Sequence, residues 1–310
     1  MRKNNMRQIY DVIIVGAGPA GLAAAIYTGR SRQNTLILEK SIPGGQILLS
    51  DYVENYPGFP EGVAPFQLME SFKEQAERFG ANIETDEAKE IRKGNDYWHI
   101  LSSRNEYIAR AVIIATGSIF RKLGVKGEAE LTGRGVSYCA VCDGAFFKDK
   151  RVAVVGGGNL ALAETLFLSR FARMVKIIHR RDNFRGEKIL QERIFKNDKI
   201  EVIWDSVIEK IMGEGKLKSV TLRDVKDNTL SELNLDGLFI SIGTDANSSL
   251  VKGFLDINEW GQIKVSKTLA TSQPGIYAAG DVTDSCPQQI ATAVGTGVAA
   301  ALAVDNYLGR

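Results

Sequence analysis

Two segments of this chain share one pattern of apolar and polar positions. In the first, an apolar run at residues 12–15 leads into glycines and then into an alanine-rich stretch that ends near Arg30. In the second, an apolar run at residues 152–155 leads into glycines and a further apolar stretch that ends near Arg170. Each segment continues to another short apolar run, at residues 35–38 and 175–178. A strand, a tight turn, a helix and a second strand in this order predict two βαβ units.

The glycine spacing of the first unit predicts a dinucleotide site. Gly16, Gly18 and Gly21 stand where such a fold needs a tight turn, close approach of the backbone to a pyrophosphate, and close packing of helix on strand. The N-terminus of the following helix then faces the phosphates. Glu39 ends the second strand, where a carboxylate accepts hydrogen bonds from a ribose diol.

The second unit has the same glycine pattern but lacks the acid. Where Glu39 stands in the first unit, the second has His179, Arg180 and Arg181, and Arg185 follows shortly after. A carboxylate at this place repels a 2′-phosphate, whereas guanidinium groups bind it bidentately. The cluster therefore favours NADPH over NADH, and the alternative is a solvated basic strand end.

An acid-type and an arginine-type site in one chain indicate two cofactors, with FAD in the first and NADPH in the second. Strands that end in small residues at 111–117 and 275–281 predict an FAD domain divided by an insertion, and Asp281 is a candidate partner for a ribityl hydroxyl or a simple turn residue. We expect a final helix at residues 290–308 whose N-terminus faces the flavin. The predicted fold is α/β, with two Rossmann-like domains of three layers (ββα) and the NADPH domain, residues 122–248, inserted into an FAD domain of residues 1–121 and 249–310.

Charge and hydropathy narrow the function classes. The 39 basic and 37 acidic residues are spread along the chain and give a net charge of +2, so no basic tail points to nucleic acid. Residues 12–27 are apolar enough to raise the question of a signal peptide, but they are shorter than the roughly 20 residues of a membrane span and contain Gly-Pro-Ala-Gly. We expect a soluble, cytoplasmic protein with no membrane partner.

The cysteines point to redox chemistry. Two of the three, Cys139 and Cys142, are separated by two residues, unlike the dispersed even set of a secreted, disulfide-stapled protein. A tetrahedral zinc site needs more ligands than this pair supplies, and the only histidines are His99 and His179. The third cysteine, Cys286, is expected to be a packed side chain rather than a third redox group.

Taken together, these motifs resemble the low-molecular-weight thioredoxin reductases over essentially the whole chain. The most specific of them is Cys139-Ala-Val-Cys142-Asp143, placed just before the second glycine loop. The other matching stretches are residues 16–21, 44–46, 54–58, 115–117, 179–185, 280–281 and 295–297.

The resemblance implies an electron path. NADPH reduces FAD, FAD reduces a Cys139–Cys142 disulfide, and the dithiol reduces thioredoxin or a thioredoxin-like protein. Cys142 then lies against the flavin, Cys139 attacks the partner, and Asp143 exchanges protons, although a helix-capping role for Asp143 is the alternative. A homodimer is implied, and so is a rotation of the NADPH domain between two orientations.

The resemblance also assigns cofactor ligands. For FAD they are Gly16, Gly18, Pro19, Ala20, Gly21, Glu39, Gly45, Gln46, Asn55, Ala115, Thr116, Gly117, Gly280, Asp281, Gln289 and Ile290. For NADPH they are Gly156, Gly158, Asn159, Leu160, Ala161, Glu164, His179, Arg180, Arg181, Arg185 and Gly243. Two residues depart from the family pattern. Leu160 stands where a small hydroxyl residue is usual, which puts the affinity for NADPH in question, and Gln288 stands where a basic residue is usual, which bears on the choice of partner.

Four other functions remain open at this stage. Three use the same scaffold: a reductase of a glutaredoxin-like or peroxidase-linked protein, a ferredoxin-driven reductase, and a dithiol oxidase. The arginine cluster argues against the ferredoxin-driven enzyme. The fourth is a non-catalytic nucleotide-binding redox sensor, which would not need Asp143 beside the pair.

Overall fold

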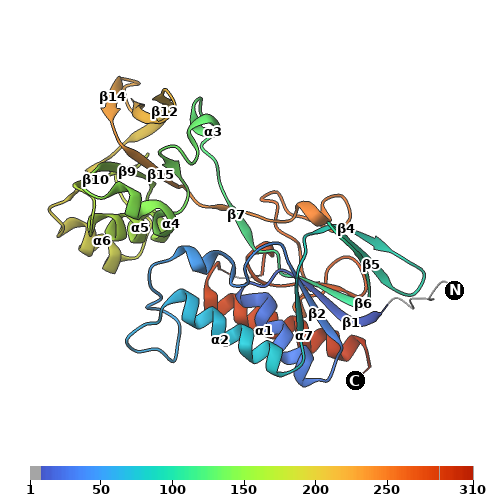
Figure 1. Cartoon of the computed structure of the whole chain (residues 1–310). Coiled ribbons are helices and arrows are strands. Elements are labelled where there is room, and N and C mark those ends of the chain that lie inside the picture. Colours follow the sequence, from blue (N-terminus) through green and yellow to red (C-terminus); the bar gives the residue numbers. More distant parts are fainter. Residues whose placement is uncertain (1–7, 286, 310) are drawn as a thin grey trace. The chain divides into compact units, whose positions relative to one another are not determined.

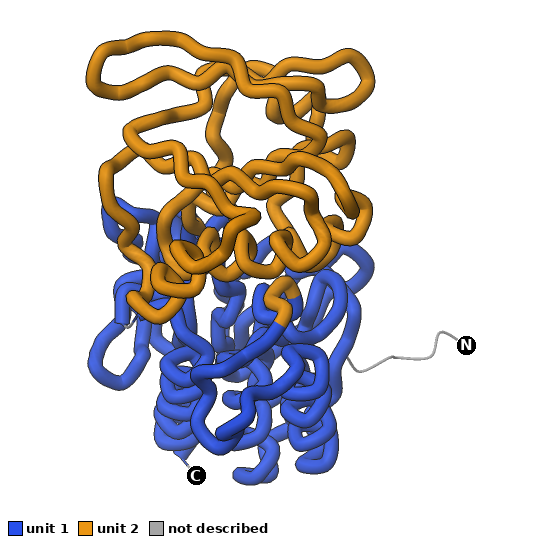
Figure 2. The backbone as a smooth tube through the Cα atoms, turned by 90° about the vertical axis from the view of Figure 1, so that its left-hand side faces the viewer, with its two compact units in different colours: residues 1–48, 52–119, 245–310 blue, residues 49–51, 120–244 orange. Residues whose placement is uncertain are grey.

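The computed structural model describes residues 8–285 and 287–309, and the chain divides into two compact units (Figures 1 and 2). Unit 1 comprises residues 1–48, 52–119 and 245–310, and unit 2 comprises residues 49–51 and 120–244. Unit 2 is therefore inserted into the sequence of unit 1. Cys286 lies outside the described residues.

Unit 1 is built on a mixed sheet with the strand order β3-β2-β1-β6-β5-β4, and β17 also pairs with β6. The parallel strands are β1 (Ile9–Val15), β2 (Thr35–Glu39), β3 (Asn82–Thr85), β6 (Glu106–Ile114) and β17 (Ile276–Ala278). The antiparallel strands β4 (Ala88–Lys93) and β5 (Trp98–Ser102) extend the sheet beyond β6. β17 stands outside this linear order because it pairs with β6, which already has β1 and β5 as neighbours in the order.

Both faces of this sheet are covered, which explains why β1 is a continuous apolar run. Val12 and Ile14 belong to an apolar cluster with residues of the helices α1 (Pro19–Arg30), α2 (Pro65–Arg78) and α7 (Ile290–Tyr307). The alternate residues Ile13 and Val15 belong to a second cluster with β4, β5 and the 3₁₀ helix η3 (Ser249–Val251). Further short elements are the 3₁₀ helices η1 (Gly45–Leu49) and η4 (Gly280–Val282).

Unit 2 repeats this layering around a parallel sheet with the strand order β11-β10-β9-β15-β8. Its strands are β8 (Val136–Ser137), β9 (Arg151–Gly156), β10 (Met174–Ile178), β11 (Ile200–Ile203) and β15 (Gly237–Ser241). An antiparallel sheet of β12 (Ser206–Gly213), β13 (Leu217–Asp224) and β14 (Leu230–Asn234) forms a separate layer. The helices are α3 (Glu128–Leu131), α4 (Ala140–Asp143), α5 (Asn159–Ser169), α6 (Lys188–Phe195) and the 3₁₀ helix η2 (Gly144–Phe147).

Successive side chains of β9 point to opposite faces of the sheet and show the three layers of unit 2. Ala153 and Val155 pack with residues of β12 and β13, whereas Val152 and Val154 pack with residues of α4 and α5. Both units therefore have the predicted three-layer α/β architecture. The two chain segments at the unit boundary, β7 (Ser118–Phe120) and β16 (Thr244–Ala246), pair with each other as a two-stranded sheet.

The apolar segment at residues 12–27 forms most of β1, the glycine turn and most of α1. Within the described part of the chain, no helix combines the length and the apolar character that a membrane crossing requires.

Candidate active site

The first glycine loop lies at the carboxyl end of β1, between the strand and α1. Gly16 has a φ of +108°, and a Cβ atom placed on it would lie 2.3 Å from the carbonyl oxygen of Ala115. A Cβ atom on Gly21 would lie 1.9 Å from the carbonyl oxygen of Gly16, so both positions exclude a side chain. Gly18 differs, because the nearest atom to its Cβ position is Cα of Gly45 at 3.9 Å. The loop is thus tightly packed at its two ends and open in the middle.

Glu39 is held against this loop. The backbone N–H of Ala17 donates to Oε2 of Glu39 at 2.9 Å, and the N–H of Ser41 donates to Oε1 at 3.0 Å. The carboxylate is therefore fixed beside the first turn of α1, on the strand next to the glycine loop.

Several of the other predicted FAD residues meet at the same edge of the sheet. Nε2 of Gln46 donates to Oγ of Ser118 at 2.9 Å, and that hydroxyl lies 3.5 Å from Oδ2 of Asp281. Burial is the main cause that raises the pKa of Asp281, and the Ser118 hydroxyl opposes it. Nδ2 of Asn55 donates to Oε1 of Gln289 at 3.1 Å, directly before α7.

The remaining predicted positions belong to the same elements. A Cβ atom on Gly280 would lie 2.9 Å from Cβ of Ala20, which brings η4 against α1. The hydroxyl of Thr116 donates to the carbonyl oxygen of Asn247 at 2.7 Å. Pro19 begins α1, Ala115 and Gly117 follow β6, Gly45 begins η1 and Ile290 begins α7.

The second glycine loop joins β9 to α5 in unit 2. A Cβ atom on Gly156 would lie 2.2 Å from the carbonyl oxygen of Ser241, and one on Gly157 would lie 2.3 Å from Cε1 of His179. No atom lies within 4 Å of the Cβ position of Gly158. As in unit 1, the loop is closed at its start and open at the residue before the helix.

The basic cluster lies beside this loop, and its members differ in burial. The backbone N–H of Arg185 donates to the carbonyl oxygen of Gly157 at 2.8 Å. Arg180, Arg181 and Arg185 are exposed, and none of them forms an ion pair with an acid among the residues that the structure describes. Their charges are therefore available to an anion.

His179 is placed differently from the arginines. It is buried, and its ring lies with Phe184 and Trp204 at centroid distances of 5.6 and 6.1 Å. Burial is the main cause that lowers the pKa of His179, with the nearby arginine charges acting in the same direction. Its Nε2 atom has no hydrogen-bond partner in the described structure. His179 thus supports the loop from beneath as a neutral ring.

Other predicted NADPH residues also have partners within unit 2. Nδ2 of Asn159 donates to Oε1 of Glu187 at 2.8 Å, and the N–H of Glu187 donates to Oδ1 of Asn159 at 2.7 Å. Leu160 is half-buried and Ala161 is buried in the core. Gly243 is exposed, with a φ of +108°, and its carbonyl oxygen accepts from the N–H of Arg121 at 3.0 Å.

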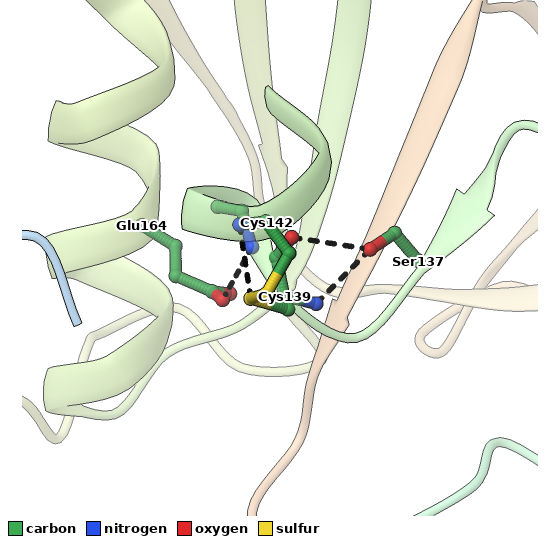
Figure 3. Close-up of a disulfide and its surroundings, with 5 residues drawn as sticks. Ser137, Cys139, Cys142 and Glu164 are labelled. Atoms are coloured by element: carbon green, nitrogen blue, oxygen red, sulfur yellow. Dashed lines mark hydrogen bonds between the residues drawn. A yellow bond between two sulfur atoms is a disulfide. The ribbon is translucent and has the colours of Figure 1, made fainter. Parts of the chain in front are cut away.

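Cys139 and Cys142 form a disulfide at the start of α4, with their Cα atoms 5.4 Å apart (Figure 3). The backbone N–H of Cys142 points at Sγ of Cys139, with the two atoms 3.1 Å apart. Cys139 is nearly covered, whereas Cys142 is exposed. Asp143 is half-buried and ends the helix, and its N–H donates to the carbonyl oxygen of Cys139 at 3.2 Å. The two sulfur atoms therefore have unequal surroundings.

Two buried side chains, Ser137 and Glu164, hold the turn at Cys139 and Ala140, a role that was not predicted for either of them from the sequence. Oγ of Ser137 accepts from the N–H of Cys139 at 3.0 Å and donates to its carbonyl oxygen (Figure 3). Glu164, which was predicted among the NADPH ligands, is buried, with one carboxylate oxygen accepting from Ala140 and the other from Ser241. A signal for Glu164 was present, because it lies three residues after Ala161 and four before Leu168, both of which face the core.

The segment that leads into the pair is fixed by another buried carboxylate. The hydroxyl of Tyr138 donates to Oε1 of Glu128 at 2.6 Å, and Glu128 also accepts from the N–H groups of Leu123 and Gly124. Burial, followed by the Glu128 carboxylate, raises the pKa of Tyr138 to about 12. Tyr138 therefore remains a protonated donor at neutral pH.

Both glycine loops suit a dinucleotide. The caps of α1 and α5 are Gly18 and Gly158, and neither helix has a side-chain cap, so their first N–H groups remain available to phosphate oxygens. In each loop a Cβ atom at the cap would occupy the open space beside these N–H groups. The carboxylate of Glu39 suits a ribose diol in unit 1, and the three arginines suit a 2′-phosphate in unit 2.

Comparisons with known proteins agree with this geometry. The family model described as pyridine nucleotide-disulphide oxidoreductase matches residues 10–297. A thioredoxin reductase from Bacillus subtilis is 47% identical over 97% of this chain and 95% of its own length. The structure of Lactococcus lactis thioredoxin reductase has a TM-score of 0.94 and 42% identity, covering 96% of this chain and 99% of that chain. T. acidophilum thioredoxin reductase has a TM-score of 0.92 and 37% identity, covering 97% and 99%.

These matches span nearly the full length of both partners, and they confirm the predicted fold class of an NADPH domain inserted into an FAD domain. Proteins of this group are flavoenzymes that use FAD and NADPH, which confirms the two cofactor predictions. The chain belongs to the pyridine nucleotide-disulphide oxidoreductase family and, within it, to the thioredoxin reductases.

Proposed function

We propose that this chain is an NADPH-dependent thioredoxin-disulfide reductase whose Cys139–Cys142 pair passes an electron pair to thioredoxin. The observation that carries the proposal is the disulfide itself, with the N–H of Cys142 pointing at Sγ of Cys139. The hydrogen bond from this N–H stabilises a thiolate on Cys139, and a stabilised thiolate is the nucleophile that a thiol–disulfide exchange needs.

The cofactors are assigned to the two units. When bound, NADPH and FAD supply the hydride chemistry that delivers two electrons to the disulfide. We propose that the FAD domain comprises residues 1–121 and 249–310, and that residues 122–248 form the NADPH domain. In the first, Gly18 would leave room for the pyrophosphate, Glu39 would hold the ribose, and Asp281 would bind a ribityl hydroxyl. The other proposed FAD contacts are Gly16, Pro19, Ala20, Gly21, Gly45, Gln46, Asn55, Ala115, Thr116, Gly117, Gly280, Gln289 and Ile290.

In the NADPH domain the proposed contacts fall into two groups. Arg180, Arg181 and Arg185 bind the 2′-phosphate, because they are exposed and unpaired among the described residues. Gly156, Gly158, Asn159, Leu160, Ala161 and Gly243 line the remaining site. His179 and Glu164 support the loop from within the domain, since both are buried.

The thiol steps follow from the unequal sulfur atoms. Two electrons break the bond between the sulfurs. Cys142, which is exposed, takes up one proton and becomes a thiol, and Cys139 keeps the negative charge beside the N–H of Cys142. The Cys139 thiolate then attacks the thioredoxin disulfide, which forms a mixed disulfide and releases one thioredoxin thiolate. Cys142 attacks Cys139, which restores the chain's disulfide and releases the second thiolate. Asp143, next to Cys142, is placed to exchange protons with these sulfurs.

A comparison of partners tests this function. NADPH consumption is measured with thioredoxin, with glutaredoxin and with oxygen as acceptors, each at equal concentration. The proposal predicts the highest kcat/KM with thioredoxin, and a loss of this turnover in Cys139→Ser. Faster turnover with glutaredoxin or oxygen would favour the other reductases of this scaffold, and consumption of electrons from ferredoxin alone would favour the ferredoxin-driven enzyme.

We also propose that the enzyme is a homodimer that works in the cytoplasm. The family resemblance supports the dimer, and the requirement for a continuous supply of NADPH supports the compartment. Light scattering of the FAD-loaded enzyme tests the dimer, and a monomeric mass would contradict it.

A further inference from the structure

We infer that Glu164 is a positioning residue for the redox pair: its carboxylate fixes the first turn of α4, so that the backbone N–H of Cys142 stays directed at Sγ of Cys139. The inference deepens the proposed function, and it rests on that function for the use to which the pair is put. The geometry itself is independent of the identity of the partner.

The carboxylate reaches the turn from a different helix. Glu164 belongs to α5 and is 4% exposed, and Figure 3 shows its side chain directed at the turn that carries Cys139. Oε1 of Glu164 accepts from the backbone N–H of Ala140 at 3.0 Å. Ala140 directly follows Cys139 and is fully buried, so its N–H would lack a partner without this carboxylate.

The second carboxylate oxygen holds the side chain in place. Oε2 of Glu164 accepts from Oγ of Ser241, which is itself 4% exposed. Ser241 ends β15 and pairs with Gly156 of β9, and its carbonyl oxygen lies directly against that glycine. The same carboxylate thus joins the end of β15 to the redox turn, and each of its oxygens already accepts one hydrogen bond.

This linkage matters for the thiol because the N–H of Cys142 lies only two residues beyond that of Ala140. Both are in the single turn of α4, so a change in the direction of one changes the other. A hydrogen bond to an ionised sulfur lowers the thiol pKa by about one unit. Glu164 therefore holds Cys139 in the environment that favours its thiolate.

Few charges surround this carboxylate. Burial is the main cause that raises the pKa of Glu164, and the Ser241 and Ala140 bonds oppose it. The elements that pack against α5 carry these titratable side chains: Cys142 and Asp143 on α4, with Cys139 directly before it, Arg151 on β9, Lys176 on β10, and Lys188, Glu192 and Arg193 on α6. Burial and these two hydrogen bonds account for the direction in which the pKa of Glu164 shifts, so its charge and its hydrogen bonds are the two properties to separate.

Two neutral variants separate the effect of the charge of Glu164 from the effect of its hydrogen bonds. Glu164→Gln keeps an acceptor for Ala140, whereas Glu164→Ala removes both the charge and the acceptor. The FAD-loaded enzyme is reduced with dithiothreitol and alkylated with iodoacetamide over a range of pH, and mass spectrometry of the peptides separates Cys139 from Cys142 and Cys286. We expect the Cys139 pKa to be about one unit higher in Glu164→Ala than in Glu164→Gln. Equal values in the two variants would overturn the inference.

A control variant on α5 shows whether any substitution of a buried residue in this helix changes the Cys139 pKa. The hydroxyl of Thr165 is buried, and among the residues that the structure describes it bonds the carbonyl oxygen of Ala161 alone, so Thr165→Val should leave the Cys139 pKa unchanged. If Glu164→Ala does not fold, Ser241→Ala takes its place, because it keeps the carboxyl group of Glu164 and removes the hydroxyl that holds one of its oxygens. That variant should speed hydrogen exchange at the Ala140 amide and raise the Cys139 pKa. No change in either would overturn the inference.

These readouts are independent of thioredoxin. If the chain fails to reduce thioredoxin but the pKa difference is found, the proposed function fails and the positioning role of Glu164 stands. If turnover is found and the two variants share one pKa, the positioning role fails alone.

Discussion

Adjacent glycines in the second loop should respond in opposite ways to a single methyl group. A Cβ atom at residue 157 would lie 2.3 Å from Cε1 of His179 and 2.5 Å from Nδ1, and the His179 ring is 5% exposed. The ring cannot move freely, because Phe184 and Trp204 pack against it and against each other. Gly157→Ala should therefore act as an overpacking substitution and cost about 1–3 kcal/mol of stability.

Gly158→Ala is the matched control. The Cβ position of Gly158 has no atom within 4 Å, and its φ of −97° suits any residue. The free energy of unfolding should stay nearly unchanged. The new methyl group would instead occupy the space proposed for the pyrophosphate, so affinity for NADP⁺ should fall by about tenfold or more, which corresponds to 1.4 kcal/mol.

Urea unfolding and calorimetric titration with NADP⁺ measure the two effects. Trp204 is the only tryptophan of unit 2, since Trp98 and Trp260 belong to unit 1, and its fluorescence reports on the ring cluster. The double variant Gly157→Ala/His179→Ala should be more stable than the sum of the single effects predicts, because the clash is removed with the ring. Additive effects would contradict a clash between residue 157 and the His179 ring. A Gly158→Ala variant that loses stability but keeps its affinity would contradict a pyrophosphate site beside Gly158.

Three further outcomes are expected. Replacing Arg180 and Arg181 by alanine should lower kcat/KM for NADPH by at least tenfold and leave kcat/KM for NADH unchanged. Equal losses for the two nucleotides would contradict a 2′-phosphate contact. The pKa of His179 is lowered in the folded state. Below about pH 6.5 the unfolded chain therefore binds more protons than the folded chain does, and the free energy of unfolding of unit 2 should fall as the pH falls through that value. His179→Gln should flatten this pH dependence in urea melts, and an unchanged slope would exclude His179 as its source. Glu39→Ala should lower the FAD content of the purified enzyme, and full occupancy after dialysis would count against a ribose contact.

The sequence was most informative where the chemistry is local. The glycine loops and the Cys139–Cys142 pair are short motifs whose spacing fixes their geometry, because a turn or a helical start involves only a few consecutive residues. The same applies to Glu39, which ends the strand beside its loop. These features could therefore be predicted from the order of the amino acids alone.

Interactions between distant residues could not be predicted in this way. His179 belongs to a basic run that suggests a phosphate contact, but the ring packs under Gly157 because β10 ends beside β9. Glu164 follows a phosphate loop, but α5 turns it towards the sheet and α4. Ser137 and Ser241 are small polar residues in apolar segments, and only the pairing of β8, β9 and β15 shows what they hold.

An anaerobic titration with NADPH tests directly whether electrons pass through Cys139 and Cys142. The FAD-loaded enzyme is titrated with its absorbance recorded, and free thiols are counted at the end. The wild-type chain should consume one equivalent of NADPH for the flavin and one more for the disulfide, with two new thiols, whereas Cys139→Ser/Cys142→Ser should consume only the first. Equal consumption by both proteins, with no new thiols in the wild-type chain, would contradict this electron path.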